Sequence, residues 1–218
     1  MRSLVVIHDY GLLNGTTLTF LIADVSGKSI PGAMFMMRAK SVINSLVDSG
    51  LPVNEVFTEA NARLSTENDA KMFVTAWLGY MDVATGEVQF CDAGHNPPVL
   101  IRNGRAEFIP QKADLILGFL EDVSYSSQSL TLKKGDMLFL YTDGAPEAKN
   151  KDGEFYGNDR LLQILSVKEQ DLPAHKLGCT AAMCQRLADD LNQFYAGSEQ
   201  FDDITMLCIR YNGTPEEK

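Results

Sequence analysis

The chain has 218 residues, 45% of them hydrophobic, and it carries a formal net charge of −10. This length supports one substantial domain or at most two small ones. The acidic balance argues against nucleic acid and anionic membranes as partners. No apolar stretch reaches about 18 residues and no signal peptide is visible, so we expect a cytoplasmic protein without membrane insertion.

The four cysteines, at positions 91, 179, 184 and 208, have no paired spacing. This usage is typical of reduced thiols in the cytoplasm rather than of a disulfide framework. Cys91 and Cys208 lie in strand-like runs, so packing in the core is their simplest role.

The N-terminal part of the chain predicts a hairpin that ends in an acid. Leu4–Ile7 has the composition of a strand, and Asn14-Gly15 is a hairpin turn signal before Thr17–Ala23. The apolar run then closes with Asp24. A carboxylate at the end of a buried strand is rigidly held yet reaches solvent and ligands. The alternative is that Asp24 only caps the turn.

Two helices are predicted next, over Ile30–Ser49 and Val53–Ser65. Apolar residues recur in the first at i, i+4, i+7, i+8 and i+11, and Gly50 and Pro52 end it. We assign the cluster of Met34, Met36 and Met37 to an adaptable core.

The middle of the chain reads as antiparallel strands. Hairpins are expected from residues 72–83 with 87–91 and from 99–102 with 105–109, followed by a strand over Tyr125–Leu132. His95 lies in the tight connection 92–98, where a structural hydrogen bond is the simpler reading and proton transfer the alternative.

Two further strands bring acids to their ends. Met137–Tyr141 is followed by Asp143, and Ile204–Ile209 is preceded by Asp202 and Asp203. A helix starting over 160–165 and a long amphipathic helix with an apolar stripe from Leu177 to Tyr195 lie between them. If the last strand runs antiparallel to the others, the acids gather at one sheet edge. They would repel each other there unless a cation lies between them. Oxygen ligands of this kind suit Mg²⁺ or Mn²⁺, and two such ions form a phosphoester-cleaving arrangement.

Four motifs carry a family resemblance in their order along the chain: DVSGK at 24–28, CDAGHNPP at 91–98, YTDGAPEA at 141–148 and FDDITML at 201–207. Together they resemble the SpoIIE/RsbU-type bacterial serine phosphatases of the metal-dependent PPM (PP2C-like) superfamily, over residues 9–211. The resemblance implies an α+β fold, a PP2C-like α-β-β-α sandwich of two mainly antiparallel sheets flanked by helices. It implies one phosphatase domain over 1–211, followed by a polar tail over 212–218.

The resemblance also implies a site. Two Mn²⁺ or Mg²⁺ ions would be bound by Asp24, the Val25 carbonyl, Asp143 and Asp202, with Asp24, Asp143 and Asp202 as the catalytic acids. Asp203 is the less favoured member of its pair, because the first acid of the doublet matches the family's ligand position. Gly27 and Lys28 are candidates for binding the substrate phosphate, although Lys28 reads equally well as a solubilising residue.

The activity implied is hydrolysis of phosphoserine or phosphothreonine by direct attack of metal-bound water. The substrate implied is a small anti-anti-sigma factor of the STAS type, and an upstream sensor or receiver domain would supply the signal. Homodimerisation is left open. As an alternative to a purely structural role, the resemblance implies that the two helices over 30–49 and 53–65 can form a regulatory switch element that repositions the metal-binding loop. Some features depart from the family. The family usually has an earlier segment that resembles GGDFYD, and Asp9 falls on the last acid of that segment. Val6, however, falls where the first acid would lie, and the two glycines and the strand before them are missing. The domain is therefore expected to be incomplete at its N-terminus, and an inactive pseudophosphatase that binds a protein partner is the alternative.

Overall fold

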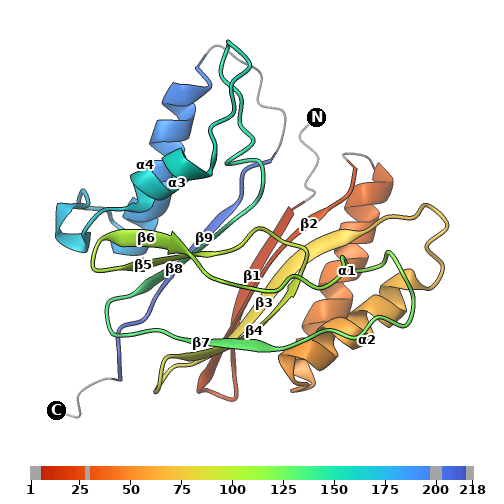
Figure 1. Ribbon diagram of the computed structural model, residues 1–218. Helices are drawn as coiled ribbons and strands as arrows, with labels where there is room; N and C mark the ends of the chain where they lie inside the picture. The colour runs from red at the N-terminus through yellow and green to blue at the C-terminus, as the bar shows by residue number, and fades with distance from the viewer. Residues whose placement is uncertain (1–5, 28–29, 197–202, 215–218) are drawn as a thin grey trace. The chain divides into compact units, whose positions relative to one another are not determined.

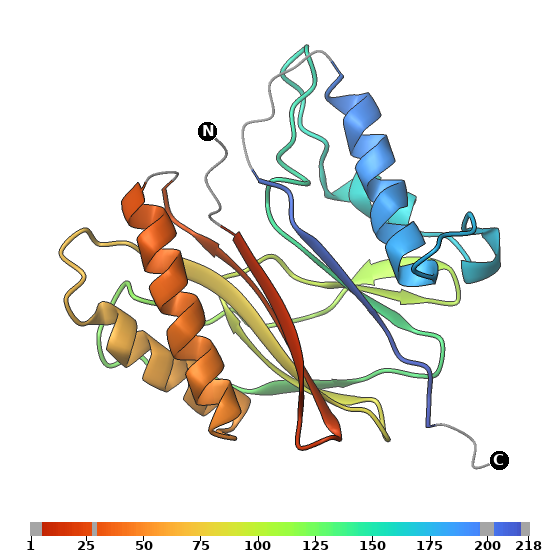
Figure 2. The same ribbon diagram turned by 180° about the vertical axis from the view of Figure 1, so that it is seen from behind.

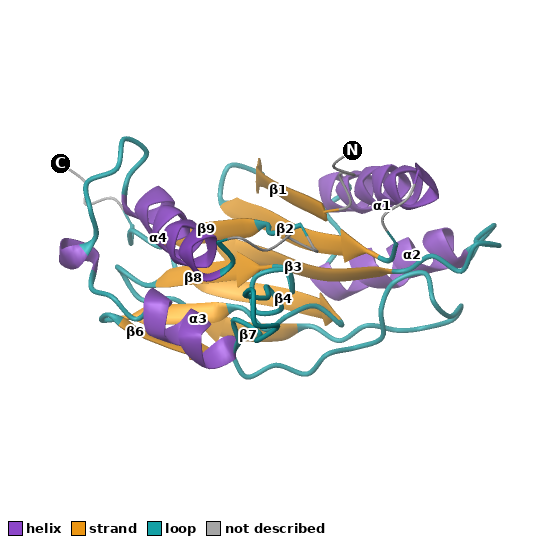
Figure 3. Cartoon of the chain, turned by 90° about the horizontal axis from the view of Figure 1, so that it is seen from above, coloured by secondary structure: helices purple, strands orange, loops and turns teal. Residues whose placement is uncertain are grey.

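A computed structural model of the protein describes residues 6–27, 30–196 and 203–214. These residues form two compact units, of which the first comprises residues 1–95 and 111–132 and the second residues 96–110 and 133–218. Within the described ranges, every helix is too short or too polar to cross a lipid bilayer. Figure 3 shows helices and strands in both units, in agreement with the predicted α+β class.

The first unit is built on a five-stranded antiparallel sheet in the order β1-β2-β3-β4-β7 (Figure 1). The strands are β1 (Val6–Leu13), β2 (Thr17–Val25), β3 (Val74–Asp82), β4 (Glu87–Ala93) and β7 (Gln128–Thr131). Asn14 and Gly15 turn the chain between β1 and β2 with φ of +53° and +73°. This left-handed pair is the turn that an Asn-Gly hairpin needs, so the predicted hairpin is confirmed.

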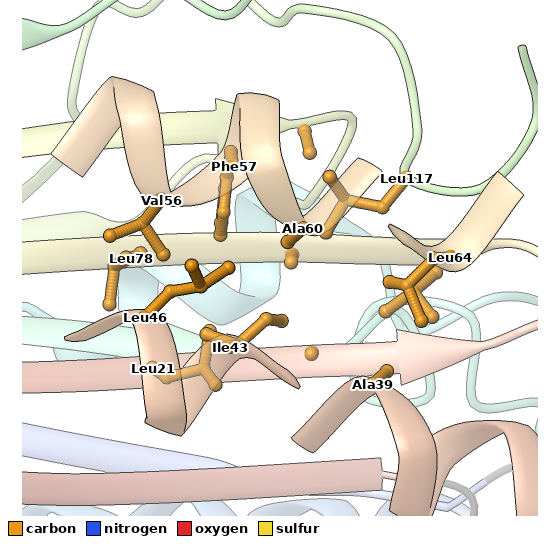
Figure 4. Packing of buried hydrophobic residues seen from close by; sticks show 14 of the residues in the cluster. Leu21, Ala39, Ile43, Leu46, Val56, Phe57, Ala60, Leu64, Leu78 and Leu117 are labelled. Carbon is orange, nitrogen blue, oxygen red and sulfur yellow. The ribbon is translucent and has the colours of Figure 1, made fainter. Parts of the chain in front are cut away.

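Helices α1 (Ile30–Asp48) and α2 (Val53–Ser65) lie side by side on one face of this sheet. Alternate residues of β2 and β3 supply the sheet side of the core, and each helix supplies one apolar face (Figure 4). The helix bounds agree with the prediction, but the assignment of the methionines is partly wrong. Met36 is buried, whereas Met34 and Met37 are 67% and 73% exposed, because they lie on the face of α1 that points away from the sheet.

The opposite face of the same sheet carries the aromatic residues. Trp77 of β3 stacks on Phe20 of β2 and on Phe90 of β4, with ring centroids 5.6 and 4.9 Å apart. All three side chains are at most 1% exposed. This face also carries Asp24, because alternate residues of β2 point the same way and Asp24 is four residues beyond Phe20.

The second unit is built on a four-stranded antiparallel sheet in the order β6-β5-β8-β9 (Figure 2). Its strands are β5 (Val99–Arg102), β6 (Arg105–Phe108), β8 (Met137–Tyr141) and β9 (Met206–Arg210). β8 is one of the two inner strands of the sheet, and all five of its residues are buried. Its antiparallel pairing with β9 meets, for β8, the condition under which the acids at the ends of these two strands come together.

Helices α3 (Asn158–Leu165) and α4 (Cys179–Phe194) pack on this second sheet, with a short 3-10 helix (Glu169–Asp171) between them. Asp190 of α4 joins the helices, since it accepts hydrogen bonds from Arg160 at 2.8 Å and from the Tyr156 hydroxyl at 2.6 Å. The predicted apolar stripe of α4 is partly wrong, although Leu191 is buried and Cys184 and Tyr195 pack against the core as predicted. Leu177 precedes the helix and is 80% exposed, and the buried residues are Ala182, Met183, Leu187 and Leu191.

Two predicted strands are shorter than expected, for local reasons. The strand predicted over 125–132 is limited to β7, because Tyr125 packs in the core of the first unit and Asp114 binds the Ser126 amide at 2.6 Å. The strand predicted from Ile204 begins at Met206. The Thr205 amide is bonded instead to the hydroxyl of Thr142 at 3.0 Å.

Candidate active site

Asp24 lies at the end of β2, one residue before the strand terminates, and is partly exposed. Its partner on β1 in the strand register is Val6, and its partner on β3 is Thr75. Directly opposed residues of antiparallel strands have Cβ atoms roughly 4.5–5.5 Å apart. Thr75 is therefore the polar neighbour of Asp24 across the sheet, and the register position on the other side belongs to a valine.

The loop after Asp24 is fixed to β3 and to α1. The Ser26 amide donates to the Phe73 carbonyl at 2.9 Å, and the Phe73 amide donates to the Ser26 hydroxyl at 3.0 Å. Gly27 has φ of +88°, and a Cβ on Gly32 would overlap the Gly27 carbonyl oxygen. Two glycines thus allow the start of α1 to approach this loop closely. Gly27 is exposed there, and Lys28 lies outside the described residues.

In the second unit, a threonine hydroxyl holds the Asp143 segment against the chain before β9. Thr142 is fully buried, its hydroxyl donates to the Asp203 carbonyl at 3.0 Å, and the same oxygen accepts from the Thr205 amide at 3.0 Å. Asp143 follows directly and is partly exposed. Asp143 and the backbone of Asp203 therefore belong to one end of one sheet. Asp202, the favoured ligand of the doublet, lies outside the described residues.

The predicted loop 92–98 contains a buried polar network in the first unit. Asp92 is fully buried and accepts from the His95 amide at 2.8 Å and from the Gln111 side chain at 2.8 Å. Burial raises the pKa of Asp92 to about 7, against the lowering effect of the hydrogen bond from His95. The His95 ring, 6% exposed, lies 3.1 Å from the Thr75 hydroxyl through Nδ1. The predicted structural hydrogen bond of His95 is present.

The sequence alone indicated that the acids gather at a single sheet edge, and this expectation is wrong. Asp24 belongs to the first sheet, and Asp143 and Asp203 belong to the second. Within residues 6–27, 30–196 and 203–214, no three His, Cys, Asp or Glu side chains lie close enough together to bind a metal ion. The donor chemistry nonetheless fits Mg²⁺ or Mn²⁺. Each unit offers partly exposed carboxylate at the end of a strand, beside backbone carbonyls.

Asp9, which falls on the last acid of the family pattern, is engaged with helix α1. Its carboxylate lies 3.2 Å from the Lys40 ammonium and accepts from Asn44 at 2.8 Å. These partners lower its pKa and outweigh the opposing effect of burial. In this structure Asp9 joins β1 to α1.

Sequence reasoning missed Thr75 and Thr142, the two hydroxyl residues beside the candidate acids. Thr142 precedes Asp143 within the YTDG motif, so its position was visible but its bonds to another strand were not. Thr75 has no local signal, since only the β2–β3 register brings it opposite Asp24.

Comparisons with known proteins relate this chain to bacterial phosphatases. The family model described as Stage II sporulation protein E (SpoIIE) matches residues 14–212. The phosphoserine phosphatase RsbU of Bacillus subtilis is 28% identical over 195 residues, which cover 89% of this chain and 56% of RsbU. Protein IcfG of Synechocystis sp. is 24% identical over 232 residues, which cover 94% of this chain and 35% of IcfG. The chain thus spans about a third to just over half the length of these relatives.

Among solved structures, the PP2C phosphatase domain of SpoIIE from Bacillus subtilis, with a fragment of its regulatory domain, superposes with a TM-score of 0.80. Its sequence identity is 18%, over 96% of this chain and 58% of that one. A likeness of this kind establishes the fold, which is that of PP2C phosphatase domains. Since the family model covers most of the chain as well, the chain belongs to the SpoIIE family of bacterial PP2C-like serine phosphatases.

Proposed function

We propose that this chain is the catalytic domain, over residues 1–211, of a metal-dependent protein serine/threonine phosphatase. The observation that carries the proposal is the placement of acids at strand ends in both units. Asp24 ends β2, and the Thr142 hydroxyl holds the segment of Asp143 to that of Asp203. Carboxylates held by rigid strands, with little freedom to reorganise, are suited to binding divalent cations.

In this proposal, Asp24, the Val25 carbonyl, Asp143 and Asp202 hold two Mn²⁺ or Mg²⁺ ions. When bound, such ions polarise a phosphoryl group and lower the pKa of water. The chain's own residues fix the position of these ligands. Ser26 fastens the loop after Asp24 to Phe73, and the Thr142 hydroxyl, next to Asp143, bonds the backbone carbonyl of Asp203. Gly27 and Lys28, which follow Ser26 in the sequence, would meet the substrate phosphate.

The substrate class that we propose is phosphoserine or phosphothreonine on a small regulatory protein of the STAS, anti-anti-sigma type. The support is the similarity to RsbU, a phosphoserine phosphatase, and to the SpoIIE family. An upstream sensor or receiver domain would set the activity. The acidic net charge of −10 favours a substrate docked through a defined protein surface over nonspecific attraction of a phosphate group.

The test is turnover of p-nitrophenyl phosphate and of a phosphorylated STAS-domain protein, with Mn²⁺, with Mg²⁺ and with EDTA. We expect metal-dependent release of phosphate that EDTA abolishes. Asp24→Asn should lower kcat by at least a hundredfold without a change in the unfolding midpoint. Asp152→Asn, which changes an exposed aspartate in a turn, is the matched control and should be silent. Full turnover by Asp24→Asn would refute the assignment.

A second candidate function is that of a pseudophosphatase, which binds a protein partner without turnover. The observation in its favour is the register of β1, which puts Val6 opposite Asp24 where the family pattern has an acid. Such a protein would bind the phosphorylated STAS-domain protein and Mn²⁺ but release no phosphate. Val6→Asp would then be expected to create activity, whereas in an active enzyme it changes an existing rate.

A further inference from the structure

A buried chain of hydrogen bonds in the first unit leads toward Asp24. The Trp77 indole donates to Gln111 Oε1 at 3.0 Å, and Gln111 Nε2 donates to Asp92 Oδ2 at 2.8 Å. Because an indole can only donate, it fixes which end of the Gln111 amide faces Asp92. The other carboxylate oxygen of Asp92 accepts from the His95 amide at 2.8 Å. The backbone of His95 is therefore held from within the core.

The side chain of His95 extends this chain to β3. Its Nδ1 lies 3.1 Å from the hydroxyl of Thr75, and the ring is 6% exposed. Gly94, with φ of +73°, makes the turn that brings the ring there, and a Cβ at that position would overlap Ile116. A ring held this tightly is suited to orienting a neighbour, and its burial argues against exchange of protons with solvent.

Thr75 is the link to the candidate site, because it is the cross-strand partner of Asp24. A threonine hydroxyl has one proton and two lone pairs. If His95 Nδ1 carries the ring proton, it donates to Thr75, and the Thr75 proton remains for an acceptor on the face shared with Asp24.

We propose that His95 is a positioning residue for Asp24 and acts through the Thr75 hydroxyl. His95 and Thr75 together hold the Asp24 carboxylate in the orientation that binds a divalent cation. Groups that orient a ligand in this way raise metal affinity by roughly 10- to 100-fold. This inference rests on the proposed function, since it takes Asp24 to be a metal ligand.

The test measures Mn²⁺ affinity by calorimetry on the full chain, apart from turnover. Thr75→Val removes the hydroxyl at nearly constant shape and should weaken Mn²⁺ binding about tenfold. Thr75→Ser keeps the hydroxyl and should restore most of the affinity. Thr17→Val is the matched control, because Thr17 also lies opposite an aspartate, Asp82, in the same strand pair. It should leave Mn²⁺ affinity unchanged.

A double-mutant cycle then separates His95 from general structural effects. His95→Gln alone should weaken Mn²⁺ binding about as much as Thr75→Val does. The double variant should bind Mn²⁺ less than threefold more weakly than Thr75→Val alone. At saturating Mn²⁺ the KM for p-nitrophenyl phosphate should be unchanged in each variant. Emission from Trp77, the single tryptophan, reports whether the buried network persists. Should His95→Gln fail to fold, Thr75→Val and Thr75→Ser still decide the role of the hydroxyl.

Two failures are distinguishable. If Asp24→Asn abolishes Mn²⁺ binding while Thr75→Val binds as tightly as the wild type, the positioning role is wrong and the proposed function stands. If Asp24→Asn binds Mn²⁺ unchanged, both are wrong. Independent effects of His95→Gln and Thr75→Val would also overturn the claim that His95 acts through Thr75.

Discussion

The hydroxyl of Thr142 donates to the carbonyl of Asp203 at 3.0 Å, 61 residues further along the chain. The same oxygen accepts from the Thr205 amide at 3.0 Å, so one buried side chain satisfies two backbone groups where β9 has not yet begun. The segments that carry Asp143 and Asp203 are thereby held together by a side chain as well as by the β8–β9 ladder. This arrangement makes Thr142 a test of the second half of the site.

Thr142→Val should lower the free energy of unfolding by about 2 kcal/mol, because two partly buried backbone groups lose their bond to the Thr142 hydroxyl. It should also lower metal-dependent turnover, as the acids on the two segments lose their fixed spacing. Thr142→Ser keeps the hydroxyl and is the control, expected near wild type in both urea unfolding and rate. Loss from Thr142→Ser with none from Thr142→Val would show that the methyl group, and not the hydrogen bonds, matters.

Gly32→Ala tests the approach of α1 to the loop after Asp24. Replacing a helical glycine by alanine ordinarily stabilises a helix by about 1 kcal/mol. Here the added Cβ would overlap the Gly27 carbonyl, so we expect destabilisation of about 1–3 kcal/mol and slower turnover. Ser41→Ala, an exposed position of the same helix, serves as the control. Stabilisation by Gly32→Ala in thermal unfolding would contradict the close approach.

Arg38 of α1 caps helix α2. Its guanidinium donates to the carbonyls of Arg63 and Thr66 at 2.6 and 2.9 Å, which α2 leaves without partners at its C-terminus. Arg38→Met should lower the free energy of unfolding by about 1 kcal/mol and increase amide hydrogen exchange in the last turn of α2. Arg63→Met keeps the accepting carbonyl and should have little effect. Unchanged exchange in Arg38→Met would show that the cap contributes nothing in solution.

Stability should depend on pH through Asp92, whose pKa burial raises to about 7 from a usual 3.8. The folded chain then holds a proton that the unfolded chain has lost, so the stabilisation is complete below about pH 4 and is lost as the pH rises through 7. The difference in unfolding free energy between wild type and Asp92→Asn should shift by on the order of 3 kcal/mol across this range. Urea unfolding at pH 4.5, 6 and 7.5 measures it. A difference independent of pH would show that Asp92 is ionised throughout.

Much of this architecture could be predicted from local pattern. The bounds of α1 and α2, the Asn14-Gly15 hairpin and the strand before Asp143 follow from periodicity and turn residues that act over a few positions. The apolar stripe of α4 was partly misplaced because Leu177, Ala181 and Ala188 are apolar, as are the residues that the helix buries. Only packing against the sheet chooses between the two faces.

The candidate site was harder to predict, because the pairing register of neighbouring strands decides which residues lie beside its acids. The motifs identified Asp24 and Asp143, but nothing near Asp24 in the sequence points to Thr75, about 50 residues away. The methionines of α1 show the same limit. Met36 packs in the core and Met37 beside it is exposed, although their chemistry is identical. A pattern of residue types fixes which faces exist, and the tertiary contacts decide which face is covered.

The division of the chain has a consequence for synthesis on the ribosome. Residues 96–110, which form the β5–β6 hairpin, belong to the second unit but lie between two segments of the first unit in the sequence. The sheet of this hairpin is completed only by β9, which ends at Arg210. At typical translation rates of about 5–20 residues per second, the hairpin would wait roughly 5–20 seconds for that last strand. An isolated hairpin is at best marginally stable in water. The apolar residues Val99 and Ile101 are therefore available to a chaperone, or to a misfolded partner, until β8 has been made and pairs with β5.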